Sequence, residues 1–269
     1  MQLASRFAYR SPVLRSNHPL SDDQIRTVAP SIFADTPHES RSERYSYIPT
    51  AAVLTELRKE GFQPFMVCQT RVRQEDRRDY TKHMLRLRHA SQINGTEANE
   101  IILLNSHDGT SSYQMLAGMF RFVCQNGLVC GDTFADVRVP HKGNVTDHVI
   151  EGAYEVLHGF EQVQDSRDAM RAITLDDGEA EVFARSALVL KYEEPGKTLP
   201  ITESQILRPR RFDDNHVDLW STFNRVQENL VKGGLTGRSA NGRQQRTRPV
   251  QGIDQSVRLN RALWLLADG

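Results

Sequence analysis

The chain has 269 residues, of which 38% are hydrophobic and 25% charged, a composition typical of one sizeable globular core or of a core with a helical extension. It contains no apolar run near the roughly 18 residues of a membrane-spanning helix, and residues 1–20 lack the continuous apolar segment of a secretory signal. These observations exclude a membrane-embedded class and predict a cytoplasmic protein. The odd set of three cysteines agrees with free thiols in a reducing compartment.

The formal net charge of zero conceals an uneven distribution of charge along the chain. Residues 69–90 carry seven Lys or Arg against three acids, and residues 232–249 carry five basic residues and no acid. Between them, residues 147–181 contain ten acids and two arginines. An acidic middle between two basic segments argues against indiscriminate polyanion binding, and it allows a local anion-binding surface.

The chain begins with a polar, irregular segment over residues 1–44, for which we predict an extended arm with at most short elements. An α+β core domain follows over residues 45–192. Its first element is a helix from Pro49 to about Lys59, because proline is tolerated in the first helical turn and Gly61 provides a stop.

An antiparallel meander sheet is predicted after this helix. The expected strands cover residues 65–73, 80–89, 100–105, 113–124 and 133–139. Asp108-Gly109 and Asn126-Gly127 supply the residues that tight turns need at positive φ, and a bulge is expected at Gly118.

The rest of the chain has helical periodicity. Helices are predicted over residues 149–163, 179–192, 202–207, 216–231 and 253–267, with Thr202 as a cap. Residues 193–269 therefore form a helical C-terminal extension, interrupted by a Gly- and Arg-rich loop over residues 232–250. The order of arm, helix, meander and helices predicts the α+β class rather than a doubly wound sheet.

The first two strands form a basic β-hairpin, which is the first candidate site. Side chains alternate between the faces of a strand, so Lys82, Arg86 and Arg88 share one face. In a suitable register Arg71 and Arg73 join them. Like charges that face each other are unfavourable, and a phosphodiester backbone would relieve the repulsion. The alternative is a solvated sheet face, where basic residues discourage aggregation.

The Gly- and Arg-rich loop is the second candidate site. Its arginines, surrounded by Gly, Ser, Asn, Gln and Thr, are Arg238, Arg243, Arg246 and Arg248. A flexible cationic segment can wrap phosphates and become ordered on contact. The alternative is a mobile surface loop whose charge is incidental.

Catalytic and metal sites find little support in the sequence. Ser106-His107-Asp108 has suitable residue types, but Asp108 and Gly109 fit a hairpin turn on their own. Cys124 and Cys130 lack a histidine at a zinc-like spacing, and the chain has no phosphate-binding glycine loop and no nucleophile elbow. We therefore predict no enzyme activity, no cofactor and no metal, with a metal-dependent nuclease as a minor alternative.

Two segments carry a resemblance to a known family, Leu103-Leu104-Asn105-Ser106-His107-Asp108-Gly109 and Phe120-Arg121-Phe122-Val123-Cys124-Gln125-Asn126-Gly127-Leu128. They resemble an uncharacterised phage/plasmid-like family, a domain of unknown function, and the resemblance extends from Tyr45 to about Ala267. It implies a mobile-element protein, encoded by prophages or conjugative plasmids, and it carries over no catalytic residue. The order of elements is also similar to the core of single-strand annealing proteins, which form rings or filaments on DNA.

The residues and the resemblances together predict a nucleic-acid-binding protein of a mobile element. We expect it to bind single-stranded DNA and to aid annealing or protection of incoming DNA, as a homo-oligomer. The alternative is an anti-defence or regulatory protein that binds a host protein through the acidic residues 147–181, without catalysis.

Overall fold

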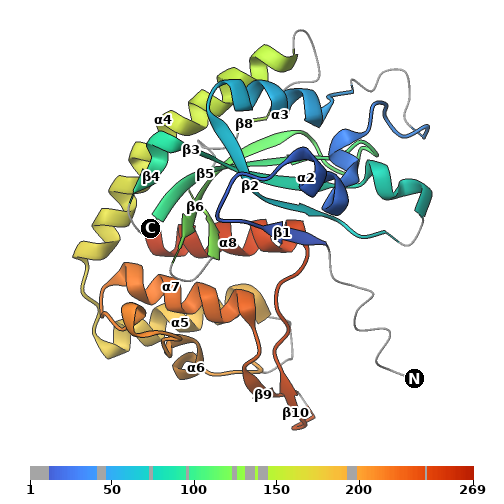
Figure 1. Cartoon of the computed structure of the whole chain (residues 1–269). Coiled ribbons are helices and arrows are strands. Elements are labelled where there is room, and N and C mark those ends of the chain that lie inside the picture. The colour runs from blue at the N-terminus through green and yellow to red at the C-terminus, as the bar shows by residue number, and fades with distance from the viewer. Residues whose placement is uncertain are drawn as a thin grey trace. The chain divides into compact units, whose positions relative to one another are not determined.

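The computed structural model divides the chain into two compact units, Met1–Phe160 and Glu161–Gly269 (Figure 1). It describes residues 12–40, 47–72, 75–94, 97–122, 126–130, 137–138, 145–192, 199–239 and 241–269. The sequence placed the boundary between residues 192 and 193. The division lies earlier because helix α5 (Asp177–Tyr192) packs against the C-terminal helices.

The first unit is built on an antiparallel sheet. Its strands, in spatial order, are β1 (Val13–Arg15), β2 (Phe62–Gln69), β3 (His83–His89), β5 (Glu97–Asn105), β6 (Gln114–Arg121) and β7 (Asn126–Val129). The short strands β4 (Ile93–Asn94) and β8 (Val137–Arg138) pair with β5 and β6. From β2 to β7 the neighbours on this path follow chain order, and every pairing is antiparallel, so the predicted α+β meander is confirmed.

Two helices pack against strand β2 of this sheet. Helix α2 (Asp22–Val28) begins with a capping box between Ser21 and Gln24, and a 3₁₀ turn, η1 (Pro30–Phe33), follows it. Helix α3 (Thr50–Lys59) presents its buried Val53, Leu54 and Leu57 to the core and ends before Gly61, at φ 89°, as predicted. The N-terminal segment therefore contains short elements that pack on the sheet.

The strand register departs from expectation at two glycines and one proline. Gly118 pairs with Glu100 in an unbroken register, so the bulge predicted there is wrong. The irregularity lies instead between Pro64 and Met66 of β2, because proline has no N–H to donate to the neighbouring strand. Gly127, which was expected in a turn, is the second residue of β7.

The second unit is helical apart from one β-ribbon. Besides α5, its elements are α6 (Glu203–Leu207), the 3₁₀ turn η5 (Phe212–Asp214), α7 (Leu219–Lys232), the strands β9 (Thr236–Arg238) and β10 (Gln244–Arg246), and α8 (Ile253–Asp268). Thr202 caps α6 as predicted. Trp220, Phe223 and Trp264 pack together, with ring centroids 5.5 to 6.3 Å apart. This aromatic cluster anchors α8 on α7.

Helix α4 (Val145–Ala172) runs through the division between the units. Its Val149, Ala153, Val156 and Phe160 are buried, and this spacing is the one that predicted the helix. None of the helices that the structure describes is both long enough and apolar enough to cross a membrane.

Candidate nucleic-acid interface

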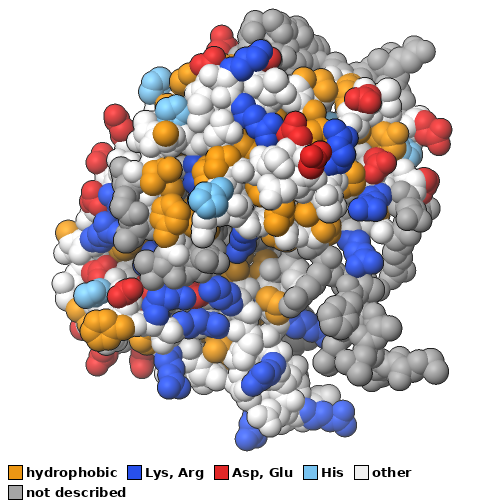
Figure 2. Space-filling model, in the orientation of Figure 1, with side chains coloured by type: hydrophobic (Ala, Val, Ile, Leu, Met, Phe, Trp, Pro, Cys, Tyr) orange, Lys and Arg blue, Asp and Glu red, His pale blue; other side chains and the backbone are white. Residues whose placement is uncertain are grey.

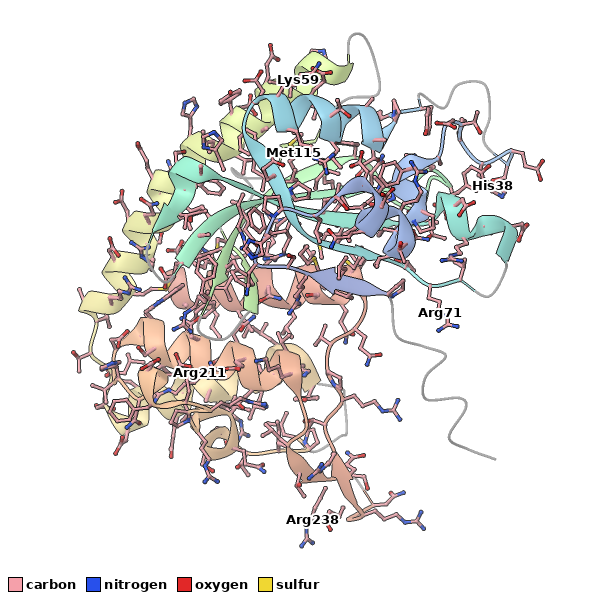
Figure 3. All side chains as sticks on the ribbon, in the orientation of Figure 1. His38, Lys59, Arg71, Met115, Arg211 and Arg238 are labelled. Carbon is pink, nitrogen blue, oxygen red and sulfur yellow. The ribbon has the colours of Figure 1, made fainter. Side chains whose placement is uncertain are left out.

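The basic stripe predicted on β2 and β3 does not form. Strand β2 ends at Gln69, which pairs with His83 at the start of β3, so Arg71 and Lys82 lie in the connection outside the paired strands. Arg71 is exposed and Lys82 is half-buried; Figure 3 labels Arg71 after the end of β2. Arg73 lies outside the described residues.

Arg86 and Arg88 lie on β3 but do not reach solvent, so their predicted place on an exposed stripe is wrong. Their exposed fractions are 6% and 3%. Arg86 Nη1 lies 2.7 Å from Glu100 Oε2, and Arg88 Nε lies 2.8 Å from Glu100 Oε1. Burying a guanidinium group requires such a partner, because desolvation of an unpaired charge is costly.

Other groups around this ion triad of Arg86, Arg88 and Glu100 also stabilise the buried guanidinium groups. Arg86 Nη2 donates a hydrogen bond to the carbonyl of Leu128, and the Arg88 guanidinium lies 4.4 Å from the Phe65 ring centroid and 4.0 Å from that of Phe120. Gly127 leaves room for Arg86, since a Cβ there would lie 1.9 Å from Arg86 Nη1. The two arginines and Glu100 therefore stabilise the sheet and are not accessible to a phosphate.

The C-terminal candidate loop contains an ordered β-ribbon. In the register of β9 and β10, Arg238 pairs with Gln244 and Arg246 pairs with Thr236. Because cross-strand partners share a face, Arg238 and Arg246 project from the same side of the ribbon and are diagonal neighbours. The strand register thus places two of the four predicted loop arginines on one face of the ribbon.

The ribbon's base is fixed to the rest of the second unit. Its opposite face carries Gly237, where a Cβ would lie 1.9 Å from the Pro200 carbonyl oxygen, and Arg238 N donates to that oxygen at 2.9 Å. At the base, Gly234 N donates to the Thr247 carbonyl at 2.9 Å. The close approach at Gly237 leaves the arginine face of the ribbon turned away from residue 200.

The ribbon's charge is unopposed. All four predicted loop arginines, Arg238, Arg243, Arg246 and Arg248, are exposed. Within the part of the chain that the structure describes, no carboxylate forms an ion pair with any of them. On the face in view, the described side chains of the ribbon are basic or uncharged (Figure 2), and Figure 3 shows Arg238 at its end. Such a surface attracts anions by long-range electrostatics.

A second arginine segment reaches the base of the ribbon. Arg210 Nη2 donates to the Gly233 carbonyl at 2.8 Å, and Arg210 Nε donates to Asn229 Oδ1 at 2.7 Å. Gly233 in turn lies against the backbone of Arg248, since a Cβ there would be 2.7 Å from the Arg248 carbonyl carbon. Arg208 and Arg210 are exposed. The sequence reasoning missed them, although three arginines within residues 208–211 were a visible signal.

Arg211 and Lys232 differ from these arginines because both form ion pairs with Glu228. Arg211 lies 2.6 Å from Glu228 Oε1, and Lys232 Nζ lies 2.6 Å from the same oxygen. Hydrogen bonding to Glu228 raises the pKa of Arg211 above its ordinary value. Arg211 therefore holds the preceding loop to α7, Lys232 pairs within α7, and neither counts toward the basic surface.

The Ser106-His107-Asp108 segment belongs to a buried polar region of the first unit. Asp108 Oδ1 accepts hydrogen bonds from the amide and hydroxyl of Thr110, which is the turn chemistry that the sequence indicated. His107 is buried, and burial lowers its pKa to about 4. Among the described residues, no group of three or more His, Cys, Asp or Glu side chains is arranged to hold a metal ion.

Comparison with known proteins places the chain in a family. Residues 37–264 match the family model described as a domain of unknown function, DUF932. The chain belongs to the DUF932 family. This DUF932 chain is 57% identical over 267 residues to two proteins of Escherichia coli (strain K12), UPF0380 protein YfjQ and UPF0380 protein YafZ. Each match covers 99% of this chain and 97% of the relative. No solved structure matches it.

Proposed function

We propose that this chain is a nucleic-acid-binding protein of a mobile element, and that it binds single-stranded DNA through the arginine face of the β9–β10 ribbon. The observation that carries the proposal is the pair Arg238 and Arg246, which share one face, are exposed, and project from a ribbon whose base is fixed. Arginine donates in-plane hydrogen bonds to phosphate oxygens, so this face suits a phosphodiester backbone.

The rest of the binding surface is electrostatic. Arg243 lies between the pair in the chain and Arg248 follows it, and Arg208 and Arg210 extend the positive surface beyond the ribbon's base. Contacts of this kind are independent of base sequence. The proposed task, annealing or protection of incoming DNA by a homo-oligomer, requires such sequence-independent binding.

A salt series tests the proposal. We expect fluorescence anisotropy of a labelled single-stranded oligonucleotide to give log Kd rising with log salt with a slope of about 0.7 for each phosphate neutralised. The double variant R238A/R246A should bind more weakly. Its slope should be smaller by roughly 1.4, because it neutralises two fewer phosphates. The matched control K59A/R77A removes two exposed charges from the first unit and should leave both quantities unchanged. Equal binding by R238A/R246A and wild type would refute the ribbon assignment.

A second candidate function is binding of a host protein, as expected of an anti-defence or regulatory factor. One observation favours it, namely a groove of about 550 Å³ in the second unit whose lining includes the apolar residues Val182, Phe183 and Leu266. Asp176 and Glu179 also line it, so it suits an amphipathic helix that carries basic residues. V182E should abolish capture of a partner from nuclease-treated lysate while oligonucleotide binding stays intact.

A further inference from the structure

Phe212 is an exposed aromatic side chain that the fold does not use. Its exposed fraction is 89%, the highest among the large apolar side chains that the structure describes. The next two are the aliphatic Val182 at 68% and Val217 at 61%. An aromatic ring that is solvated on both faces has no packing role within its own unit, and it offers a π surface to a ligand.

The turn that carries Phe212 holds the ring outward because its neighbours are anchored. Arg211 forms ion pairs with both Asp214, which is 1% exposed, and Glu228 of α7. Asn215 N donates to the Phe212 carbonyl at 2.9 Å and closes the η5 turn. Because Arg211 is held on α7 and Asp214 is held by Arg211, the backbone at Phe212 is anchored while its side chain stays in solvent.

Phe212 is close in the chain to Arg210, which contacts the base of the arginine ribbon. Arg210 donates to the Gly233 carbonyl, and Gly233 abuts the backbone of Arg248 at the base of the ribbon. Phe212 follows Arg210 by two residues, so their Cα atoms are at most about 7 Å apart. Phe212 and the exposed Arg210 thus lie on one short segment, and the side chain of Arg210 reaches the foot of the arginine ribbon.

We propose that Phe212 stacks on an unpaired base of a strand whose phosphates lie along the arginines, so that the ligand of this surface is single-stranded nucleic acid. The inference rests on the proposed function. In a duplex the base faces are already stacked and unavailable, whereas a single strand can place any base on an aromatic ring. The exposed Asp213 beside the ring repels phosphate, which directs a base rather than the backbone to this point.

The test compares Phe212 variants on three ligands of equal length: an oligo-dT strand, the same sugar–phosphate chain with abasic positions, and a duplex. We expect F212A to weaken oligo-dT binding on the order of tenfold, and F212W to restore it. F212A should leave the Kd for the abasic strand and for the duplex unchanged. V217A, which truncates another exposed apolar side chain of the same unit, is the matched control and should leave oligo-dT binding unchanged.

The outcomes separate this inference from the function on which it rests. If R238A/R246A weakens oligo-dT binding and F212A does not, the stacking role is overturned and the ribbon assignment stands. If F212A weakens binding to the abasic strand as much as to oligo-dT, stacking is also overturned. If neither R238A/R246A nor F212A changes oligo-dT binding, both proposals fail. Loss of self-association or protein binding in F212A, with unchanged Kd for oligo-dT, would identify a protein-docking residue and overturn the inference.

Discussion

Acidification should destabilise the first unit through two buried histidines. His83 is fully buried, with Nδ1 2.9 Å from Ser31 Oγ and Nε2 2.9 Å from Thr50 Oγ1. Burial, with a smaller contribution from the nearby His107, lowers the pKa of His83 to about 3. The His107 ring lies 5.2 Å away, and burial lowers its pKa to about 4.

The size of the effect follows from the ordinary histidine pKa of 6.5. Below that pH the unfolded chain binds a proton at each position while the folded chain does not, so the free energy of unfolding falls as pH falls. The loss is about 1.4 kcal/mol per pH unit for each histidine until its folded pKa is reached. At pH 5 this amounts to about 2 kcal/mol for each histidine, or roughly 4 kcal/mol together, a large part of a typical 5–15 kcal/mol domain stability. Above pH 6.5 the effect is absent.

The assay must report on the first unit. Trp220 and Trp264 both lie in the second unit, so tryptophan fluorescence is unsuitable. Hydrogen exchange of the β3 and β5 amides, followed in urea between pH 7 and pH 5, measures the required opening free energy. H83Q should reduce its pH slope by about one proton, whereas H158Q, at an exposed position, should not. An unchanged opening free energy between pH 6.5 and pH 5 would falsify the reasoning.

Three further predictions concern buried charges and one glycine. E100Q leaves two guanidinium groups without their carboxylate and should lower the free energy of unfolding by about 3–5 kcal/mol, measured by urea denaturation with circular dichroism. G237A places a methyl group 1.9 Å from the Pro200 carbonyl oxygen, so the β9 amides should exchange faster and oligonucleotide binding should weaken; unchanged exchange contradicts this. E228Q removes the carboxylate that pairs with both Arg211 and Lys232, so it should lower the midpoint of thermal unfolding measured by tryptophan fluorescence. This loss should depend little on salt concentration, because the carboxylate is 2% exposed and is therefore poorly screened.

The secondary structure was largely predictable because it depends on local patterns. The spacing of Val149, Ala153, Val156 and Phe160 indicated α4, and Thr202 indicated the start of α6; the structure confirms both. Alternating apolar residues likewise identified the strands of the meander. Helical spacing, capping residues and strand alternation all depend on residues close together in the chain, so they can be identified from the sequence alone.

The site was less predictable because it depends on pairing between distant segments. The prediction of a basic hairpin considers only the hairpin's own charges, whereas Glu100, on the next strand of the sheet, forms ion pairs with both Arg86 and Arg88. The β9–β10 ribbon was expected to be a flexible loop because its strands are short and polar. Its turn signal was present in Asn241-Gly242, where Gly242 has φ 73°.

The ion triad of the sheet has a consequence for how this family can vary. One buried carboxylate forms ion pairs with two buried guanidinium groups, so substitutions at the three positions should be coupled. A change at Glu100 alone leaves two buried cations without their carboxylate, and a change at Arg86 alone removes a hydrogen bond to the Leu128 carbonyl. Relatives should therefore keep all three residues or replace them together with apolar ones, and intermediate combinations should be rare.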